Sequence, residues 1–290
     1  MDLATLTVFR AVAREEGVTR AADLLGRAPS NVTTRIQQLE AELGTPLFDR
    51  HRKRMVLSED GRLFLDYAER ILALADEARQ RLDPSRPSGT LRIGAMESTL
   101  ASRLTAPLSR FSRDWPDVTL EVTSGPSGAL TDALLAGRID GALVAFAPGD
   151  DHPRREALDA TPLFREELVL LLPPDHPEIR GPADLRLRTL AAFAPGCTYR
   201  AVAEDWLASA GGPFRVQEVP SYHAMYGCTA AGACVSIMPR SVVALMAQPA
   251  SLHAVPVADI VTHLICRSGY DTAAYRAFRA CLVEEAGAET

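Results

Sequence analysis

The sequence has few cysteines, no long apolar run and no leader of the kind that directs secretion. Its five cysteines are odd in number and form no Cys-x-x-Cys pair, which favours reduced thiols over a disulfide framework or a zinc knuckle. No apolar stretch approaches the roughly 18 residues that a membrane helix needs. The opening residues, Met1–Thr5, are not a basic segment followed by an apolar one. We therefore expect a cytoplasmic protein that does not enter a membrane.

Motifs of several enzyme classes are also missing. There is no Gly-x-Ser-x-Gly elbow, no Walker loop, no Gly-x-Gly-x-x-Gly and no His-Glu-x-x-His. The six histidines lie far apart, without the spacing of metal ligands. A thiol dyad of Cys197 and His223 is an open alternative, but a cysteine is more often a small buried apolar residue than a nucleophile. The sequence predicts a protein that is not an enzyme and that needs no metal and no cofactor.

Length and charge point to two parts of different character. A chain of 290 residues favours two domains, and its 47% hydrophobic and 23% charged residues are ordinary for globular proteins. The net charge of −6 is unevenly spread. Residues 1–58 carry nine basic and seven acidic side chains, a net charge of +2, which leaves −8 for the remainder. This asymmetry suggests a basic module attached to an acidic body.

The first sixty residues predict three short helices and a β-hairpin. Apolar residues recur at helical spacing from Leu3 to Ala13, and Gly17 is expected to close that helix. Thr19 can cap a second helix over residues 20–25, and Pro29 suits the first turn of a third helix that runs to Leu43. Apolar residues at 46–48 and 55–57 bracket a basic tip, a pattern typical of the hairpin called a wing.

A long helix is predicted from Ser58 to about Leu82. Acidic residues in its first turn complement the helix dipole. Its apolar residues recur at alternating steps of three and four, as in helices that pair with one another. The alternative is that the helix covers the core of its own domain. The apolar residues are Phe64, Tyr67, Ala68, Ile71, Leu74, Ala75, Ala78 and Leu82.

Residues 83–89, rich in proline, serine and glycine, predict a hinge, after which strands and helices alternate. We expect strands at 91–94, 118–122, 139–146 and 168–172, with helices at 98–112 and 129–136. A second series has strands at 189–193, 216–219, 234–238 and 264–266, helices at 198–210 and 222–231, and a closing helix at 270–285. This alternation predicts a mostly parallel sheet in two lobes, with a crevice between them. Lobe 1 would span about 90–161 and 268–290, and lobe 2 about 162–267.

Two short helices joined by a tight turn are the working parts of a helix-turn-helix, whose second helix enters the major groove of DNA. Polar side chains at the start of the third helix can contact base edges: Ser30, Asn31, Thr33, Thr34 and Arg35. Basic side chains of the wing are expected to contact phosphates: Arg50, Arg52, Lys53 and Arg54. A solvated helix face and a soluble turn are the structural alternatives for the two groups. Their occurrence together within sixty residues favours binding to double-stranded DNA.

The spacing of these residues resembles the winged helix-turn-helix of LysR-type transcriptional regulators. The matching run is Phe9-x-x-Val12-Ala13, Thr19-x-Ala21-Ala22-x-x-Leu25, Val32-Thr33-x-x-Ile36-x-x-Leu39-Glu40-x-x-Leu43-Gly44-x-x-Leu47-Phe48-x-Arg50 and Leu57-Ser58-x-x-Gly61. The layout of the remaining chain is also similar to this family. The turn differs, since Ala28-Pro29 stands where the family often has Ser-Gln, and Asn31 replaces a usual alanine. The base preference of typical members therefore does not transfer.

This resemblance implies an α/β fold with an N-terminal all-α winged helix-turn-helix (1–58), a long linker helix for dimerisation (59–82), a hinge (83–89) and a C-terminal effector-binding domain (90–290). The two lobes of that domain would resemble periplasmic solute-binding proteins and hold a small co-inducer. The regulator would bind DNA as a homodimer or homotetramer and contact RNA polymerase. A transport-type solute receptor is an alternative, but it would explain neither the first eighty residues nor the missing export signal.

In such lobes, ligands bind beyond the carboxyl ends of strands, where helices begin. Six side chains have this position and are candidates for effector binding: Ser98, Thr99, Ser127, Thr198, Arg200 and His223. Residues 125–130 also match the effector-loop pattern of the family. Helix caps are the alternative role for the serines and threonines. Helix N-termini together with Arg200 favour a small anion, such as a carboxylate or an amino acid.

Overall fold

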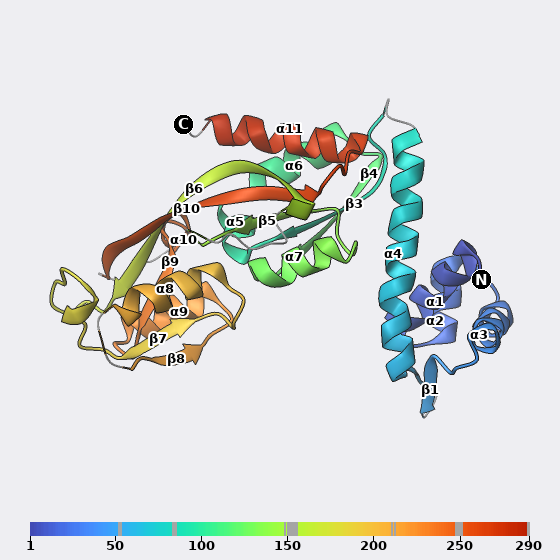
Figure 1. Cartoon of the computed structure of the whole chain (residues 1–290), viewed down its shortest axis with the longest axis horizontal. Helices are drawn as coiled ribbons and strands as arrows, with labels where there is room; N and C mark the ends of the chain where they lie inside the picture. The colour runs from blue at the N-terminus through green and yellow to red at the C-terminus, as the bar shows by residue number, and fades with distance from the viewer. Residues whose placement is uncertain are drawn as a thin grey trace. The chain divides into compact units, whose positions relative to one another are not determined.

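The computed structural model of the chain describes residues 1–51, 54–82, 86–147, 149, 156–209, 211, 213–246 and 252–288, with the backbone alone for residues 50, 51 and 288. The chain divides into two compact units, residues 1–84 with 136–138, and residues 85–135 with 139–290. Figure 1 shows the first unit in blue to cyan and the second from green to red. Within the described ranges, no helix is long and apolar enough to cross a membrane.

Three helices form the body of the first unit: α1 (Leu3–Glu15), α2 (Val18–Leu25) and α3 (Pro29–Leu43). The bounds of α3 are those predicted, and Gly44, at φ 73°, ends it in the left-handed conformation that glycine adopts without cost. The prediction that Thr19 caps α2 was wrong. Gly17 takes that position, because the backbone N–H of Ala21 already donates to its carbonyl and Thr19 lies inside the helix.

The wing is a two-stranded antiparallel sheet of β1 (Phe48–His51) and β2 (Arg54–Leu57), which leads into the long helix α4 (Glu59–Leu82). Its backbone is tied to the helices, because the N–H of Met55 donates to the carbonyl of Glu16. The hairpin and the helix both agree with the sequence prediction.

Ser58 and Gly61 fix the junction between the wing and α4. The Ser58 hydroxyl donates to the carbonyl of Pro46 at 2.8 Å and accepts from the N–H of Gly61 at 2.9 Å, so it caps the helix. A Cβ atom at Gly61 would lie 2.0 Å from the carbonyl oxygen of Leu47. Only glycine therefore allows α4 to start this close to the strand before the wing.

The core of the first unit is centred on Phe9, whose ring packs 5.4 Å from Phe48 and 5.1 Å from Phe64. Helix α4 contributes Ala68 and Leu72 to this core. The apolar residues of α4 thus lie on two different surfaces of the helix. Part of it covers the core, whereas five large apolar side chains of the helix are exposed: Leu63, Tyr67, Ile71, Leu74 and Leu82.

The second unit is built on one mixed eight-stranded sheet with the strand order β4-β3-β5-β10-β6-β9-β7-β8. Its strands are β3 (Gly89–Ala95), β4 (Val118–Ser124), β5 (Gly141–Ala145), β6 (Leu158–Leu172), β7 (Thr189–Ala192), β8 (Arg215–Glu218), β9 (Val235–Pro239) and β10 (His253–Arg267). Pairing is parallel among β3, β4 and β5, and again among β7, β8 and β9. The antiparallel strands β6 and β10 join these two groups, so the expectation of a mostly parallel sheet holds only within each lobe.

The long strands β6 and β10 pass through both lobes. They pair along their full length, with register shifts at Pro256/Ala258 and Thr262/His263. The sequence predicts only short strands at 168–172 and 264–266, with the boundaries between the lobes at 161/162 and 267/268. In the structure the chain passes from one lobe to the other within β6 and again within β10, because Phe164 of β6 and Leu264 of β10 pack in the core of lobe 1. Figure 1 shows the pair as two long arrows running side by side.

Helices cover both faces of each lobe. In lobe 1, α6 (Thr105–Asp114) and α11 (Ala273–Ala288) pack on one face and α7 (Ser127–Leu135) on the other. In lobe 2, α8 (Thr198–Ala208) and α9 (Tyr222–Ala230) lie on opposite faces, and the short α10 (Arg240–Val243) follows β9. A 3-10 turn, η2 (Pro182–Asp184), precedes β7.

The single helix predicted at 98–112 is two helices, α5 (Glu97–Ser102) and α6. Pro107 explains the division, since a proline inside a continuous helix would remove a hydrogen bond and clash with the preceding turn. In the structure it lies in the first turn of α6, where its missing N–H has no acceptor within the helix.

Candidate functional site

The first candidate site is the exposed face of α3. Ser30, Asn31 and Thr34 are exposed at the start of this helix, while Thr33 is half-buried. The hydroxyls of Thr33 and Thr34 donate to the carbonyls of Pro29 and Ser30, at 3.0 and 2.9 Å. Val32 and Ile36 on the opposite face are buried in the core, so packing fixes which face is offered to solvent.

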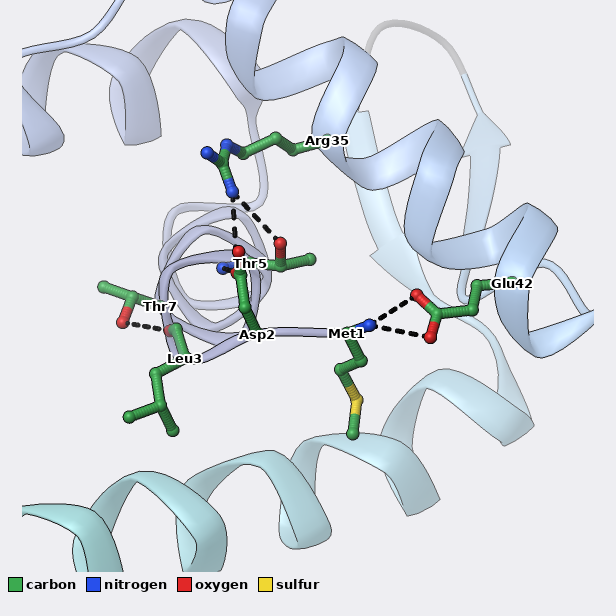
Figure 2. Close-up of polar contacts among 7 residues, drawn as sticks. All are labelled: Met1, Asp2, Leu3, Thr5, Thr7, Arg35 and Glu42. Carbon is green, nitrogen blue, oxygen red and sulfur yellow. Dashed lines mark hydrogen bonds and ion pairs between the residues drawn. The ribbon is translucent and has the colours of Figure 1, made fainter.

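Arg35 is held by the start of α1, as Figure 2 shows. Its Nη1 donates to the hydroxyl of Thr5 at 3.1 Å and lies 3.6 Å from Oδ1 of Asp2. The same Asp2 oxygen accepts from the backbone N–H of Thr5 at 2.7 Å, so Asp2 caps α1. Hydrogen bonding of Asp2 with Thr5 lowers the pKa of Asp2 most, and the positive charge of Arg35 lowers it further. Arg35 is therefore a partly buried link between two helices.

A second contact joins the chain's first residue to α3. The α-amino group of Met1 donates to both carboxylate oxygens of Glu42 at 2.7 Å (Figure 2). Together with Asp2, these residues line a polar recess of about 720 Å³. Its lining residues are Met1, Asp2, Thr5, Ser30, Asn31, Thr34, Arg35, Gln38, Leu39 and Glu42. Sequence reasoning missed Asp2 and Glu42 here, although an acid one residue before an apolar helix is a recognisable cap signal.

The basic tip of the wing is described only in part. Arg52 and Lys53 lie outside the described residues, and only the backbone of Arg50 is described. Arg54 is exposed, with Nη1 at 3.9 Å from a carboxylate oxygen of Glu16. Glu40 positions the strand, since its Oε1 accepts from the N–H groups of Leu47 and Phe48 at 2.9 and 3.2 Å.

The second candidate site is a pocket of about 200 Å³ in the second unit, where loops of both lobes meet. Lobe 1 contributes the start of α5 and the loop between β4 and α7. Lobe 2 contributes the loop between β7 and α8 and the start of α9. The lining residues are Met96, Glu97, Ser98, Ser124, Gly125, Pro126 and Ser127 from lobe 1, and Phe193, Ala194, Cys197, Tyr199, Pro220 and Tyr222 from lobe 2.

Two of the predicted effector residues, Ser98 and Ser127, line this pocket. The hydroxyl of Ser127 is already engaged, since it accepts from the N–H of Ala145 at 3.3 Å and lies 3.2 Å from the sulfur of Met96. Thr198 joins the lobes by donating to the carbonyl of Ala145 at 2.8 Å. A second bond between the lobes runs from the N–H of Gly128 to the carbonyl of Gly196, at 3.3 Å.

The structure places the other predicted residues away from the pocket wall. Thr99 is buried inside lobe 1, and His223 is exposed on α9. Arg200 donates to the carbonyl of Phe193 at 3.0 Å and pairs with Glu204 and Glu218 at 2.8 and 3.0 Å. Its charge is thus neutralised outside the pocket, which removes the side chain on which the expectation of an anionic ligand depended.

Glu97 is the charged residue that sequence reasoning missed. It lines the pocket directly before Ser98, and burial raises the pKa of its carboxyl group, an effect that nearby His223 partly offsets. Burial also raises the pKa of Tyr199 and of Tyr222, so both phenols stay neutral. Glu97 is the first residue of α5, where an acidic side chain ordinarily complements the helix dipole, so the sequence does not mark it as a pocket residue.

Cys197 also lines the pocket, and burial affects its thiol more than the opposing effects of the Tyr199 and Arg200 backbone and the Arg200 charge. Burial raises the pKa of the Cys197 thiol, which disfavours the nucleophilic thiolate. Nor do the described residues hold any group of three or more histidine, cysteine, aspartate or glutamate side chains that could bind a metal ion.

Two family models match this chain over most of its length. The model of the bacterial regulatory helix-turn-helix protein, lysR family, matches residues 3–62, and that of the LysR substrate binding domain matches residues 84–287. Among curated relatives, the uncharacterized HTH-type transcriptional regulator YusT of Bacillus subtilis (strain 168) is 38% identical, covering 91% of this chain and 88% of its own. The HTH-type transcriptional regulator GltR of the same organism is 36% identical, with 84% and 81% covered.

Solved structures show the same fold. Full-length CbnR in complex with its target DNA has a TM-score of 0.69 at 24% identity, covering 98% of this chain and 100% of its own. A variant of full-length OxyR from Pseudomonas aeruginosa has a TM-score of 0.71 at 21% identity, with 99% and 94% covered.

Proposed function

The chain belongs to the LysR family of transcriptional regulators, and we propose that its two units divide the work of a ligand-controlled DNA switch. It is a DNA-binding regulator with an effector-binding domain. In this proposal α3 binds the operator in the cytoplasm, and the pocket of the second unit binds a small molecule that changes how the operator is bound.

The observation that carries the DNA assignment is the exposed polar start of α3. Ser30, Asn31 and Thr34 are free to reach base edges, and the side chain of Asn31 can form a bidentate pair with adenine. Arg54 and the other basic residues of the wing tip would meet phosphates, which adds affinity without reading sequence. Arg35 acts mainly by fixing α3 against α1, because its guanidinium is already bonded there.

Helix α4 supports assembly into a homodimer. Its exposed apolar residues recur at steps of three and four, and 66% of Leu74 and 87% of Leu82 are exposed. Apolar stripes with this spacing pair with a second helix. A homotetramer would require a further contact between two such dimers.

Regulation would act through the two lobes. Hydrogen bonds from Thr198 and Gly128 join them across the pocket. A ligand that prefers one arrangement of the lobes would shift the population toward it and so alter contacts with DNA or RNA polymerase.

Selection of bound genomic fragments by the full-length protein tests the DNA assignment. Asn31→Ala should change which sequences are enriched. Arg54→Ala should weaken binding to cognate and random fragments alike, and it should reduce the slope of log binding constant against log salt concentration by about one. Equal effects of both variants on both kinds of DNA would overturn these roles. Failure of the wild-type protein to prefer any duplex, even at low ionic strength, would overturn the function itself.

A further inference from the structure

The polar end of the pocket contains buried hydrogen-bonding groups without a partner at hydrogen-bonding geometry among the described residues. Oε2 of Glu97, Oγ of Ser98 and Oη of Tyr199 are each buried and have no hydrogen-bond partner among the described residues. Ser98 and Tyr199 are both 3% exposed. Ser98 and Thr262 lie close enough to Tyr199 to offset part of the rise in its pKa. Buried polar groups are normally paired, and leaving one unpaired is costly. All three residues line the pocket, so a bound molecule is the natural source of the missing partners.

The charge of this end is negative. Among the described residues that line the pocket there is no lysine, arginine or histidine, and Glu97 is the one charged side chain. The starts of helices α7, α8 and α9 do favour negative charge, but Glu97 already supplies it. His223 on α9 is near enough to lower the pKa of Glu97 in part, but it does not line the pocket. Arg200, also outside the pocket, is paired with Glu204 and Glu218. An anionic ligand would therefore meet a like charge on a wall where the described lining residues include no cationic side chain.

The side chains of Glu97, Ser98 and Tyr199 together match a ligand group that donates several hydrogen bonds. A carboxylate oxygen only accepts hydrogen bonds, whereas the hydroxyls of Ser98 and Tyr199 can accept or donate. A primary ammonium group has three donors and no acceptor. It could satisfy the carboxylate and both hydroxyls at once, which neither a carboxylate nor an ether can do.

Most of the remaining wall is apolar or aromatic. Phe193 and Tyr222 meet edge to face, with ring centroids 4.8 Å apart, and Met96 and Pro126 come from lobe 1. Aromatic faces attract cations as well as apolar groups. A volume of about 200 Å³ equals that of six or seven waters at about 30 Å³ each, so the ligand is compact.

We propose that the effector is a small primary amine, bound as its ammonium ion by Glu97, Ser98 and Tyr199 with its apolar part against Phe193 and Tyr222. This inference rests on the proposed function, because it assumes that the pocket is the effector site. It replaces the sequence-based expectation of a small anion.

A matched set of probes tests the charge preference on the full-length protein without DNA. Benzylamine, benzyl alcohol and benzoate share one ring, and cyclohexylmethylamine, cyclohexanemethanol and cyclohexanecarboxylate share another. Binding is measured by calorimetry at neutral pH. An amine should bind more tightly than the alcohol and the carboxylate of the same skeleton. Glu97→Gln should weaken the amine about tenfold or more, as expected for the loss of one charge-assisted hydrogen bond.

Glu178→Gln is the matched control, because Glu178 is exposed and outside the pocket. It should leave the binding of every probe unchanged. A carboxylate that binds at least as tightly as its amine would overturn the proposal. So would an amine preference that survives Glu97→Gln, or the failure of both amines to bind at millimolar concentration. Operator binding by the same wild-type protein is measured in parallel, so failure of the ligand assignment is distinct from failure of the regulator assignment.

Discussion

Oδ1 of Asp2 lies 3.6 Å from Nη1 of Arg35, so the residue that caps the first helix also contacts the helix proposed to read DNA (Figure 2). One short side chain thereby couples the start of α1 to the orientation of α3. The position of the DNA-reading face depends on this contact as well as on the apolar core beneath it.

Asp2→Ala is expected to lower the stability of the first unit at neutral pH, whereas Asp2→Asn should retain most of it. Alanine loses the cap on α1, but asparagine is as good a cap as aspartate. The pKa of Asp2 is lowered in the folded state from its usual 3.8, chiefly by the hydrogen bonds with Thr5. The stabilisation is therefore present above pH 3.8 and is lost as the pH falls through the lowered value.

Urea unfolding of the two Asp2 variants from pH 3 to pH 7 measures this difference. The deficit of Asp2→Ala relative to wild type should shrink toward the acid end. A deficit that is independent of pH, or equal in Asp2→Asn, would contradict the capping role.

Gly61→Ala is expected to destabilise the first unit by at least about 2 kcal/mol, as for other substitutions that overfill a packed site. The added Cβ would lie 2.0 Å from the carbonyl oxygen of Leu47, and neither backbone can move without disturbing the wing or α4. Chemical denaturation gives the value. Gly227→Ala is the control, since its added methyl meets nothing within 4 Å and alanine is the better helix former. Comparable losses in both variants would argue against the clash.

Leu74→Glu is expected to weaken self-association without unfolding the chain. Leu74 is 66% exposed in the single chain, so the substitution disturbs no core, but it places a charge in the proposed helix pair. The dissociation constant should rise more than about tenfold, since burying a leucine contributes roughly 1.5–3 kcal/mol.

Sedimentation of the wild type and variants at micromolar concentration measures the effect on assembly. Arg62→Glu places the same side chain at another exposed position of α4, and it should leave assembly intact. A monomeric wild type, or equal weakening by both variants, would exclude pairing through this stripe.

Glu97→Gln should become more stable relative to wild type as the pH rises. Burial raises the folded pKa of Glu97 above its usual 4.5, although His223 limits the rise. The unfolded chain therefore releases this proton at lower pH than the folded chain, and wild type loses stability between 4.5 and the raised folded value. Below 4.5 both proteins carry a neutral side chain there.

Unfolding at several values from pH 4 to pH 7 tests this linkage, with Glu178→Gln, at an exposed position outside the pocket, as the control variant. A stability difference for Glu97→Gln that falls with pH would mean that a cation, and not burial, dominates at Glu97.

Local signals were enough to predict much of this molecule. The bounds of α3 follow from Pro29 and Gly44, and the wing follows from apolar segments around a basic tip. Ser98 and Ser127 were predicted because the sequence places both near helix starts that follow strands, and both line the pocket. Their role in effector binding stays a prediction. The extent of β6 and β10 was not predictable in this way, because each strand changes its surroundings along its length and loses a single repeating pattern.

By itself, the sequence determined the family, the DNA-binding head and the position of the crevice, because these depend on caps, turns and periodicity within short segments. Only the tertiary structure decided which side chains face the pocket. Arg200 and Glu97 both lie near helix starts, yet packing turns Arg200 toward Glu204 and Glu218 and leaves Glu97 on the pocket wall. The sign of charge in a binding site depends on which charged side chains are paired elsewhere by residues distant in sequence, and a local sequence pattern does not show these pairings.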